Sequence, residues 1–203
     1  MTLEPLKSEI EGNVPGCSLE IIPNPSPSGQ HSLLIDAEHA LAVAFFLRDA
    51  DPLRFDYCSN VTGIDWPSPE LPGKVKLKEM EEDIEQDAEA PAAYLEAVYH
   101  LYSMEKKHGP VILRMRTLNR GEGVHLPSLT PVWRSADFQE REIFDLYGIV
   151  FDGHPDLRRI LMWDEFKDHP MRRDYVEPDD YEYEPTAHEE VLRKTMQHYS
   201  QHL

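Results

Sequence analysis

Three carboxylates and a histidine between positions 140 and 154 are the residues best suited to acid–base or metal chemistry. Glu142 and Asp145 are three residues apart and share a face of any helix there, Glu140 lies just before them, and His154 follows nine residues later. The spacing matches neither the HExxH pattern of zinc hydrolases nor a CxxC metal site. We expect the carboxylates to form ion pairs with arginines at a packed interface. A metal-dependent hydrolase using Glu142, Asp145 and His154 is kept as an alternative.

Basic residues follow these carboxylates in two adjacent pairs, Arg158-Arg159 and Arg172-Arg173. Another arginine, Arg141, precedes Asp145 by four residues and could pair with it along a helix. We expect these arginines to make buried, charge-assisted hydrogen bonds, either inside the domain or to a partner.

Two histidines in the same region each stand before a proline, in His154-Pro155 and His169-Pro170. A proline restricts the preceding residue to an extended backbone. We therefore interpret both histidines as fixed hydrogen-bonding corners rather than as catalytic bases.

Other familiar chemistries lack their sequence patterns. The Gly121-Glu122-Gly123 segment lacks the third glycine of a dinucleotide-binding loop, and no Walker A pattern is present. Neither Ser128 nor Ser135 has the context of a nucleophile elbow. The two cysteines, Cys17 and Cys58, are too few for an iron–sulfur cluster, which needs about four thiolates. We expect both to be buried free thiols in a reducing compartment.

The composition limits the possible partners. The 203 residues are enough for one domain with extensions, and the formal net charge is −18. So acidic a chain is unsuited to nucleic-acid phosphates or an anionic lipid surface. No window approaches the roughly 20 apolar residues of a membrane span, and the first residues have neither a signal core nor an arginine-rich transit face. We expect a protein of the cytosol.

Hydrophobic periodicity predicts an α+β fold, with a small antiparallel sheet packed against helices, then a further helix and a long extended strap. The domain should span residues 1–151, with a charged insertion at 66–91. Its predicted elements, in chain order, are a helix at 3–10, strands at 18–22 and 32–35, a helix at 38–48, and strands at 54–65, 94–104 and 111–118.

The second half of the domain ends in a short amphipathic helix, with an apolar stripe made of Ile143, Leu146, Tyr147 and Val150 and with Gly148 placed for a left-handed cap. Beyond Phe151 the periodicity stops, and residues 152–184 are predicted to be an extended strap. Its apolar residues, Leu157, Ile160, Leu161, Met162 and Trp163, are expected to anchor on a partner. A capping-box pattern at Thr186 predicts a short terminal helix within 185–203.

These last segments also carry a family resemblance. The runs Glu140–Phe151 and Gly153–Leu161 resemble the signature of the 30 kDa subunit of respiratory complex I, known as the C subunit of the bacterial NADH:quinone oxidoreductase. The run His169–Tyr175 is similar to the GHPLRKDY ending of that family, with Asp168 where the family has glycine. The residues of the signature and predicted interface are Glu140, Arg141, Glu142, Asp145, Gly148, Phe151, Gly153, His154, Pro155, Asp156, Leu157, Arg158, Arg159, Leu161, Trp163, His169, Pro170, Arg172, Arg173, Asp174 and Tyr175.

The resemblance implies a cofactor-free core subunit of the hydrophilic arm of complex I, without catalytic residues of its own. Such a subunit packs on the D subunit, the forty-nine-kilodalton type, and on neighbouring hydrophilic-arm subunits. The whole complex holds FMN and iron–sulfur clusters, transfers electrons from NADH to quinone and couples this to proton pumping. The expected location is the cytoplasmic face of the bacterial inner membrane, as a peripheral subunit.

Other functions stay open beside the resemblance. A homologous subunit occurs in membrane-bound hydrogenases and ferredoxin-linked complexes, which would change the electron donor. The stand-alone metal hydrolase described above belongs to another class. A free cytosolic binding module is also possible, and it would have no large exposed apolar arm.

Overall fold

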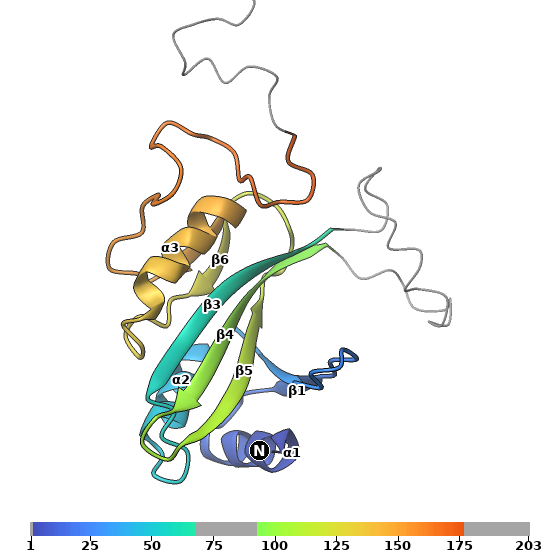
Figure 1. Cartoon of the computed structure of the whole chain (residues 1–203), viewed down its shortest axis with the longest axis vertical. Coiled ribbons are helices and arrows are strands. Elements are labelled where there is room, and N and C mark those ends of the chain that lie inside the picture. The colour runs from blue at the N-terminus through green and yellow to red at the C-terminus, as the bar shows by residue number, and fades with distance from the viewer. Residues whose placement is uncertain (1, 68–92, 177–203) are drawn as a thin grey trace, which may run out of the picture.

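A five-stranded sheet forms the centre of the molecule in the computed structural model, which describes residues 2–67 and 93–176 (Figure 1). The strand order is β1-β2-β5-β4-β3. The bounds in chain order are α1 Leu3–Asn13, β1 Leu19–Ile22, β2 Ser32–Ile35, α2 Ala40–Asp49, β3 Tyr57–Trp66, β4 Tyr94–Ser103, β5 His108–Arg116, β6 Val124–Pro127, α3 Ala136–Tyr147 and β7 Ile149–Asp152.

The alternation of side chains explains which face of the sheet is buried. On β5, Val111, Leu113 and Met115 point into the core, while Arg114 and Arg116 lie half-buried on the other face. The core face packs against apolar residues of both N-terminal helices, namely Leu6, Ile10, Ala40, Val43, Ala44 and Leu47. In Figure 1, α1 and α2 lie near the lower end of the sheet, and α3 lies beside β3 higher up.

The α+β class and the antiparallel run β3-β4-β5 are confirmed, but the sheet is mixed rather than wholly antiparallel. Strand β2 pairs in parallel with β5, with Leu33 opposite Leu113. The chain leaves β2 through α2 and crosses to the far edge, so β2 finds its second neighbour only when β5 returns to the centre. Local periodicity does not show such a long-range pairing.

A second, two-stranded parallel sheet made of β6 and β7 flanks α3, and the sequence pattern did not predict it. Gly148 ends α3 in the left-handed conformation, with φ of 80°, as predicted. The predicted stripe was wrong at Val150, because the helix stops at Tyr147 and Val150 lies on β7. Strands β6 and β7 have four residues each, the shortest run in which alternation can indicate a strand.

The chain from residue 153 to residue 176 contains turns and bends but neither helix nor strand, and it lies above α3 in Figure 1. We call these residues the described strap. Most of the predicted insertion (residues 68–91), the rest of the predicted strap (177–184) and the predicted terminal helix (185–203) lie outside the described residues. Within the described ranges, no helix is long and apolar enough to cross a membrane.

Candidate partner-binding site

The first anchor of the strap is the carboxylate of Asp145 on α3, which is wholly buried. Its Oδ2 accepts the backbone N–H groups of Ile160, Leu161 and Met162 at 3.0, 2.7 and 2.9 Å. Its Oδ1 accepts Nη1 of Arg159 at 2.6 Å. Burial by itself would raise the pKa of this carboxyl, but the three N–H groups and the guanidinium lower it below the ordinary value. The carboxylate therefore stays ionised and holds one turn of the strap.

Arg141 supports the same turn from the preceding turn of α3. Its Nε and Nη2 donate to the carbonyl oxygens of Arg158 and Arg159, both at 3.1 Å. The expected pair between Arg141 and Asp145 is wrong, because the backbone of the strap supplies partners to both side chains. Together, Arg141 and Asp145 provide hydrogen-bond partners for backbone carbonyl and N–H groups of a segment that has no regular secondary structure.

The C-terminal end of α3 forms a second attachment point for the strap. His169 Nδ1 donates to the carbonyl of Asp145 at 3.0 Å, and Arg172 Nε donates to the carbonyl of Tyr147 at 2.7 Å. These carbonyls belong to the last turn of a helix, where intrahelical donors run out. A Cβ on Gly148 would lie 2.5 Å from His169 Nε2 and 2.9 Å from Arg172 Nη2, so only glycine permits this approach.

Arg172 also reaches beyond α3 to the loop that follows β5. Its Nη1 and Nη2 donate to the carbonyls of Arg120 and Gly121 at 3.3 and 3.2 Å. One guanidinium thus joins the helix end, the strap and this loop. Burial lowers the pKa of His169 in the same region, so this imidazole is neutral and its Nδ1 carries the proton that it donates.

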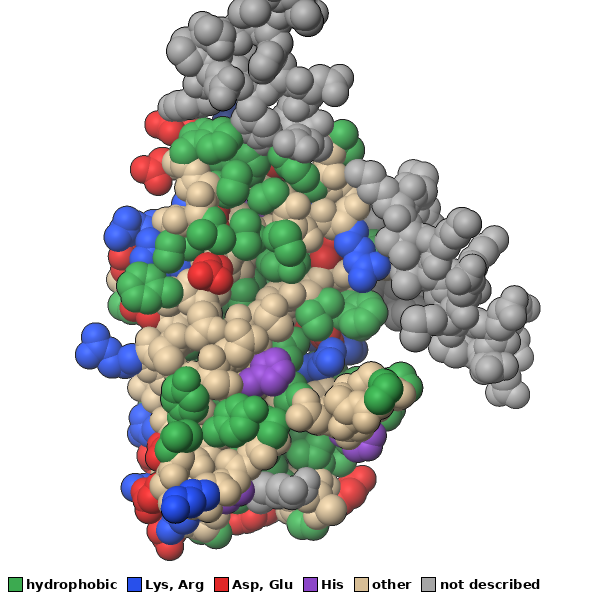
Figure 2. Space-filling model, in the orientation of Figure 1, with side chains coloured by type: hydrophobic (Ala, Val, Ile, Leu, Met, Phe, Trp, Pro, Cys, Tyr) green, Lys and Arg blue, Asp and Glu red, His purple; other side chains and the backbone are tan. Residues whose placement is uncertain are grey.

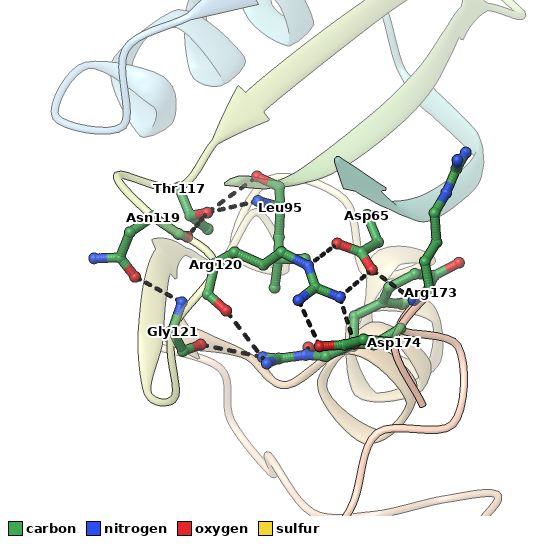
Figure 3. Close-up of polar contacts among 10 residues, drawn as sticks. Asp65, Leu95, Thr117, Asn119, Arg120, Gly121, Arg173 and Asp174 are labelled. Carbon is green, nitrogen blue, oxygen red and sulfur yellow. Dashed lines mark hydrogen bonds and ion pairs between the residues drawn. The ribbon is translucent and has the colours of Figure 1, made fainter. Parts of the chain in front are cut away.

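Arg120 lies at the centre of the third attachment point, shown in Figure 3. It forms a fork with Asp65 at the end of β3, through Nε to Oδ1 and through Nη2 to Oδ2 at 2.6 Å. It also binds Asp174 of the strap, through Nη1 and Nη2 at 2.8 and 2.5 Å. The backbone N–H of Arg173 donates to Asp65 Oδ2 at 2.7 Å. The carboxylates of Asp65 and Asp174 raise the pKa of Arg120 further above its usual range.

Neither Asp65 nor Arg120 was predicted from the sequence as part of a site. They are 55 residues apart, and nothing in the spacing of a strand-end aspartate and a loop arginine shows that they meet. Among the predicted pairs, Arg173 contributes its backbone N–H to Asp65, and Arg158 is exposed and bonds Asp156.

The signature residues divide by burial into internal and surface groups. The buried ones are Glu140, Arg141, Asp145, Gly148 and Phe151. Half-buried ones are His154, Leu157, Arg159, Trp163, His169, Pro170, Arg172 and Tyr175. The exposed ones are Glu142, Gly153, Pro155, Asp156, Arg158, Leu161, Arg173 and Asp174. The side chains of the buried group are covered by the domain itself, so only the other two groups are accessible at the surface.

The strap combines a buried aromatic residue with exposed apolar side chains. Phe166 is buried, with its ring 4.7 Å from that of Trp163 and 6.5 Å from that of Tyr175. Leu161, Met171 and Val176 are 59%, 53% and 70% exposed. Figure 2 shows hydrophobic side chains gathered at the upper end of the molecule, where the strap lies. We call the three exposed side chains of Leu161, Met171 and Val176 the apolar ridge.

The structure does not bring the candidate hydrolase residues into a metal site. Glu142 is exposed, and both oxygens of Asp145 accept hydrogen bonds from the strap. His154 donates from Nε2 to the carbonyl of Asp137 at 3.0 Å, and its Nδ1 accepts the N–H of Asp156 at 3.1 Å. Across residues 2–67 and 93–176, no three His, Cys, Asp or Glu side chains are grouped as metal ligands.

Glu140 was expected to pair with an arginine, and the structure corrects this. Its carboxyl is wholly buried and accepts hydrogen bonds from Tyr99 Oη at 3.0 Å, Ser128 Oγ at 2.6 Å and Leu129 N–H at 2.9 Å. Because these donors are neutral, burial dominates and raises the pKa of Glu140 to about 7.

The part of the chain that makes these contacts matches a known protein family. The model of the family described as the respiratory-chain NADH dehydrogenase 30 kDa subunit matches residues 33–181, which is more than half of the chain and includes all three attachment points. The chain belongs to this family. Its relatives include the C subunit of NADH-quinone oxidoreductase from Saccharopolyspora erythraea, which is 37% identical over 147 residues.

The match covers 72% of this chain but only 49% of the Saccharopolyspora erythraea protein. A second relative, the C 2 subunit of NADH-quinone oxidoreductase from Rhizobium meliloti, is 37% identical over 148 residues, covering 72% of this chain and 66% of that protein. The matched part of the chain thus spans about half to two thirds of the length of these relatives.

A solved structure supports the fold alone. A chain of the membrane-bound sulfane sulfur reductase, an archaeal respiratory membrane complex, aligns with a TM-score of 0.55 over 94% of this chain and 89% of that chain, at 16% identity. The fold of this chain therefore tolerates wide sequence divergence.

Asp145→Asn should release the strap from α3. An amide can accept from some of the N–H groups but carries no charge to pair with the Arg159 guanidinium, which would keep only the carbonyl oxygens of Asp145 and Asp168 as hydrogen-bond partners. We expect a loss of about 3–5 kcal/mol in the free energy of unfolding, measured by urea denaturation. Glu142→Gln, on an exposed position of the same helix, is the matched control and should change stability by less than about 0.5 kcal/mol. Equal effects of the two changes would contradict the anchor role.

Glu140→Gln should change the pH dependence of stability. The folded pKa of about 7 lies above the ordinary value of 4.5, so the stability due to the neutral acid is fully present below pH 4.5 and is lost as the pH rises through 7. Relative to the variant, the wild-type chain should lose about 1.4 kcal/mol per pH unit, or about 3 kcal/mol in all. Urea denaturation from pH 4.5 to 8 measures the difference, and a difference independent of pH would refute the neutral form.

Proposed function

We propose that this chain is a cofactor-free structural subunit, the C subunit, of a proton-pumping NADH:quinone oxidoreductase. Its role is to dock on the neighbouring D subunit, the forty-nine-kilodalton type, and so to hold the hydrophilic arm together. FMN, the iron–sulfur clusters and quinone belong to other parts of the complex, so this chain supports electron transfer without taking part in the chemistry. Membership in the 30 kDa subunit family supports the assignment.

The observation that carries the proposal is that the polar groups of the strap bind its own domain while several of its apolar side chains stay exposed. The polar groups at its three attachment points bind within the chain, through Asp145, Arg172 and Arg120. The side chains of Leu161, Met171 and Val176 remain in water. The strap is already ordered before binding, so association costs it little further conformational entropy. Burial of its apolar side chains on a partner therefore contributes more to the binding affinity. Exposed apolar patches on a well-anchored segment are typical of protein–protein interfaces.

The family resemblance and the named relatives favour NADH as the electron input. Both relatives described above are C subunits of NADH-quinone oxidoreductases. The fold is also found in an archaeal sulfane sulfur reductase complex, so a related respiratory complex is the second candidate. We infer that the chain is a peripheral subunit on the cytoplasmic face of the bacterial inner membrane, and that the two candidate complexes differ in their donor-side subunits.

Affinity purification of the tagged chain from gently solubilised membranes, with mass spectrometry, tests this function and its surface together. The wild-type chain should recover an assembly containing flavin and iron–sulfur subunits and a D-type subunit. Leu161→Asp should reduce that recovery by roughly tenfold or more, because a charge would be buried at the interface. Thermal stability should be unchanged, since Leu161 is exposed.

The matched control is Met104→Asp, at a side chain that is 64% exposed in the connection between β4 and β5, at the lower end of Figure 1. It should leave recovery within about twofold of the wild type, because surface changes outside an interface cost little. A chain that elutes alone would overturn the proposed function. Recovery of a different respiratory complex would replace only the named assembly.

A further inference from the structure

An open pocket lies at the turn that joins β4 to β5, at the lower end of the sheet in Figure 1 and at the opposite end from the strap. Its volume is about 290 Å³, close to that of the smallest small-molecule sites. The lining consists of Tyr102, Ser103, Met104, Lys107, His108 and Gly109. No carboxylate is among these lining residues, although the whole chain has a net charge of −18.

The pairing of β4 with β5 places Ser103 opposite His108 in this pocket. The register shifts between Leu101 and Ser103, and a bulge of this kind bends a strand and changes the direction of its side chains. A Cβ on Gly109, whose φ is 125°, would lie 3.0 Å from the carbonyl oxygen of Leu101. The close approach of the two strands beside the pocket therefore requires glycine.

His108 is the lining residue that most needs a hydrogen-bond partner. Its imidazole packs edge-on against the ring of Phe55, with the ring centroids 4.8 Å apart. Both ring nitrogens are buried, and neither has a hydrogen-bond partner within the described chain. Buried polar groups without partners destabilise a fold, so a ligand that bonds this ring stabilises it. The exposed side chains of Met104 and Lys107 border the same pocket, and their displacement opens a path to the ring.

Lys107 supplies an unpaired positive charge to the same pocket. Its side chain is exposed and forms no ion pair or hydrogen bond with any described residue. The carboxylates around the turn already have partners: Asp51 binds Lys106, Glu105 binds Arg54 and Lys106, and Asp56 accepts the backbone N–H groups of Met104 and Glu105. These three acidic side chains balance the three basic ones, so an anion meets less repulsion here than the net charge of −18 suggests.

We propose that this pocket binds a small oxyanion, of the size of phosphate or a short carboxylate. The Lys107 ammonium and an N–H group of His108 donate to its oxygens, and hydrogen bonds between charged groups are the strong ones. The Ser103 hydroxyl accepts the Lys106 N–H at 3.0 Å and still has its own proton to donate. Because the pocket and the apolar ridge lie at opposite ends of the sheet, the anion and a partner subunit can be bound together.

An NMR titration of the isotopically labelled chain tests the site, with inorganic phosphate or acetate replacing chloride at constant pH and ionic strength. The anion should shift the amide signals of Ser103, Lys107 and His108 in a saturable way. Lys107→Gln should weaken the affinity by roughly tenfold, because the variant loses the charge that pairs with the anion. Lys167→Gln, at an exposed lysine of the strap, is the matched control and should leave the affinity within about twofold of the wild type.

Thermal unfolding gives a second readout. Replacement of chloride by the bound anion should raise the Tm of the wild-type chain. His108→Phe keeps a ring against Phe55 and removes both nitrogens, so this variant should fold but its Tm should not respond to the anion. If it does not fold, the two lysine variants decide.

The comparison of the two anions identifies the ligand. Saturation by phosphate alone, by acetate alone or by both supports the site and shows which oxyanion it prefers. Absence of saturable shifts with either anion overturns the proposal, as do equal losses of affinity in Lys107→Gln and Lys167→Gln. A rise in Tm with the anion that persists in His108→Phe also overturns it.

Discussion

The geometry of the candidate site depends on one buried carboxylate. Asp145 lies on the last turns of α3 and accepts four hydrogen bonds from a segment without regular secondary structure. A charge buried in this way is tolerated only when its acceptor positions are filled, so the strap must follow one path. The turn from Arg159 to Met162 is therefore held by four hydrogen bonds to one side chain, although its backbone forms no helix.

The other attachment points extend this order to the end of the strap. His169 and Arg172 bind carbonyls of the α3 terminus, and Arg120 joins Asp174 to the end of β3. Helix, sheet and loop thus hold the strap from three directions. The strap buries Phe166 and leaves the side chains of the apolar ridge in water. A surface fixed in this way suits a permanent subunit contact.

Local patterns predicted much of this molecule. Alternation located β3, β4 and β5, and Gly148 marked the end of α3, because those signals depend only on near neighbours. The partners of Arg141 and Glu140 were mispredicted for the opposite reason. Spacing of four residues suggested a pair on the helix, but the strap backbone competes for Arg141. Neutral groups on β4 and the loop before α3 surround Glu140, and no sequence interval reveals them.

The third attachment point is the clearest example of a feature that could not be predicted from the sequence. Asp65 meets Arg120 across 55 residues, and Arg173 reaches Asp65 with a backbone group that every residue type except proline possesses. The long-range parallel pairing of β2 with β5 is hidden in the same way. The sequence could suggest that the strap carries the function, whereas its attachment to its own domain required the structure.

Methionine oxidation by hydroxyl radicals, compared between the isolated subunit and the purified complex, tests the central claim most directly. Met171 on the apolar ridge and Met104 at the opposite end of the sheet are 53% and 64% exposed, so they serve as probe and internal control. We predict that assembly slows the oxidation of Met171 by roughly tenfold, as burial removes it from solvent, while Met104 changes by less than about twofold. Equal oxidation of Met171 in both states would contradict a partner on the ridge.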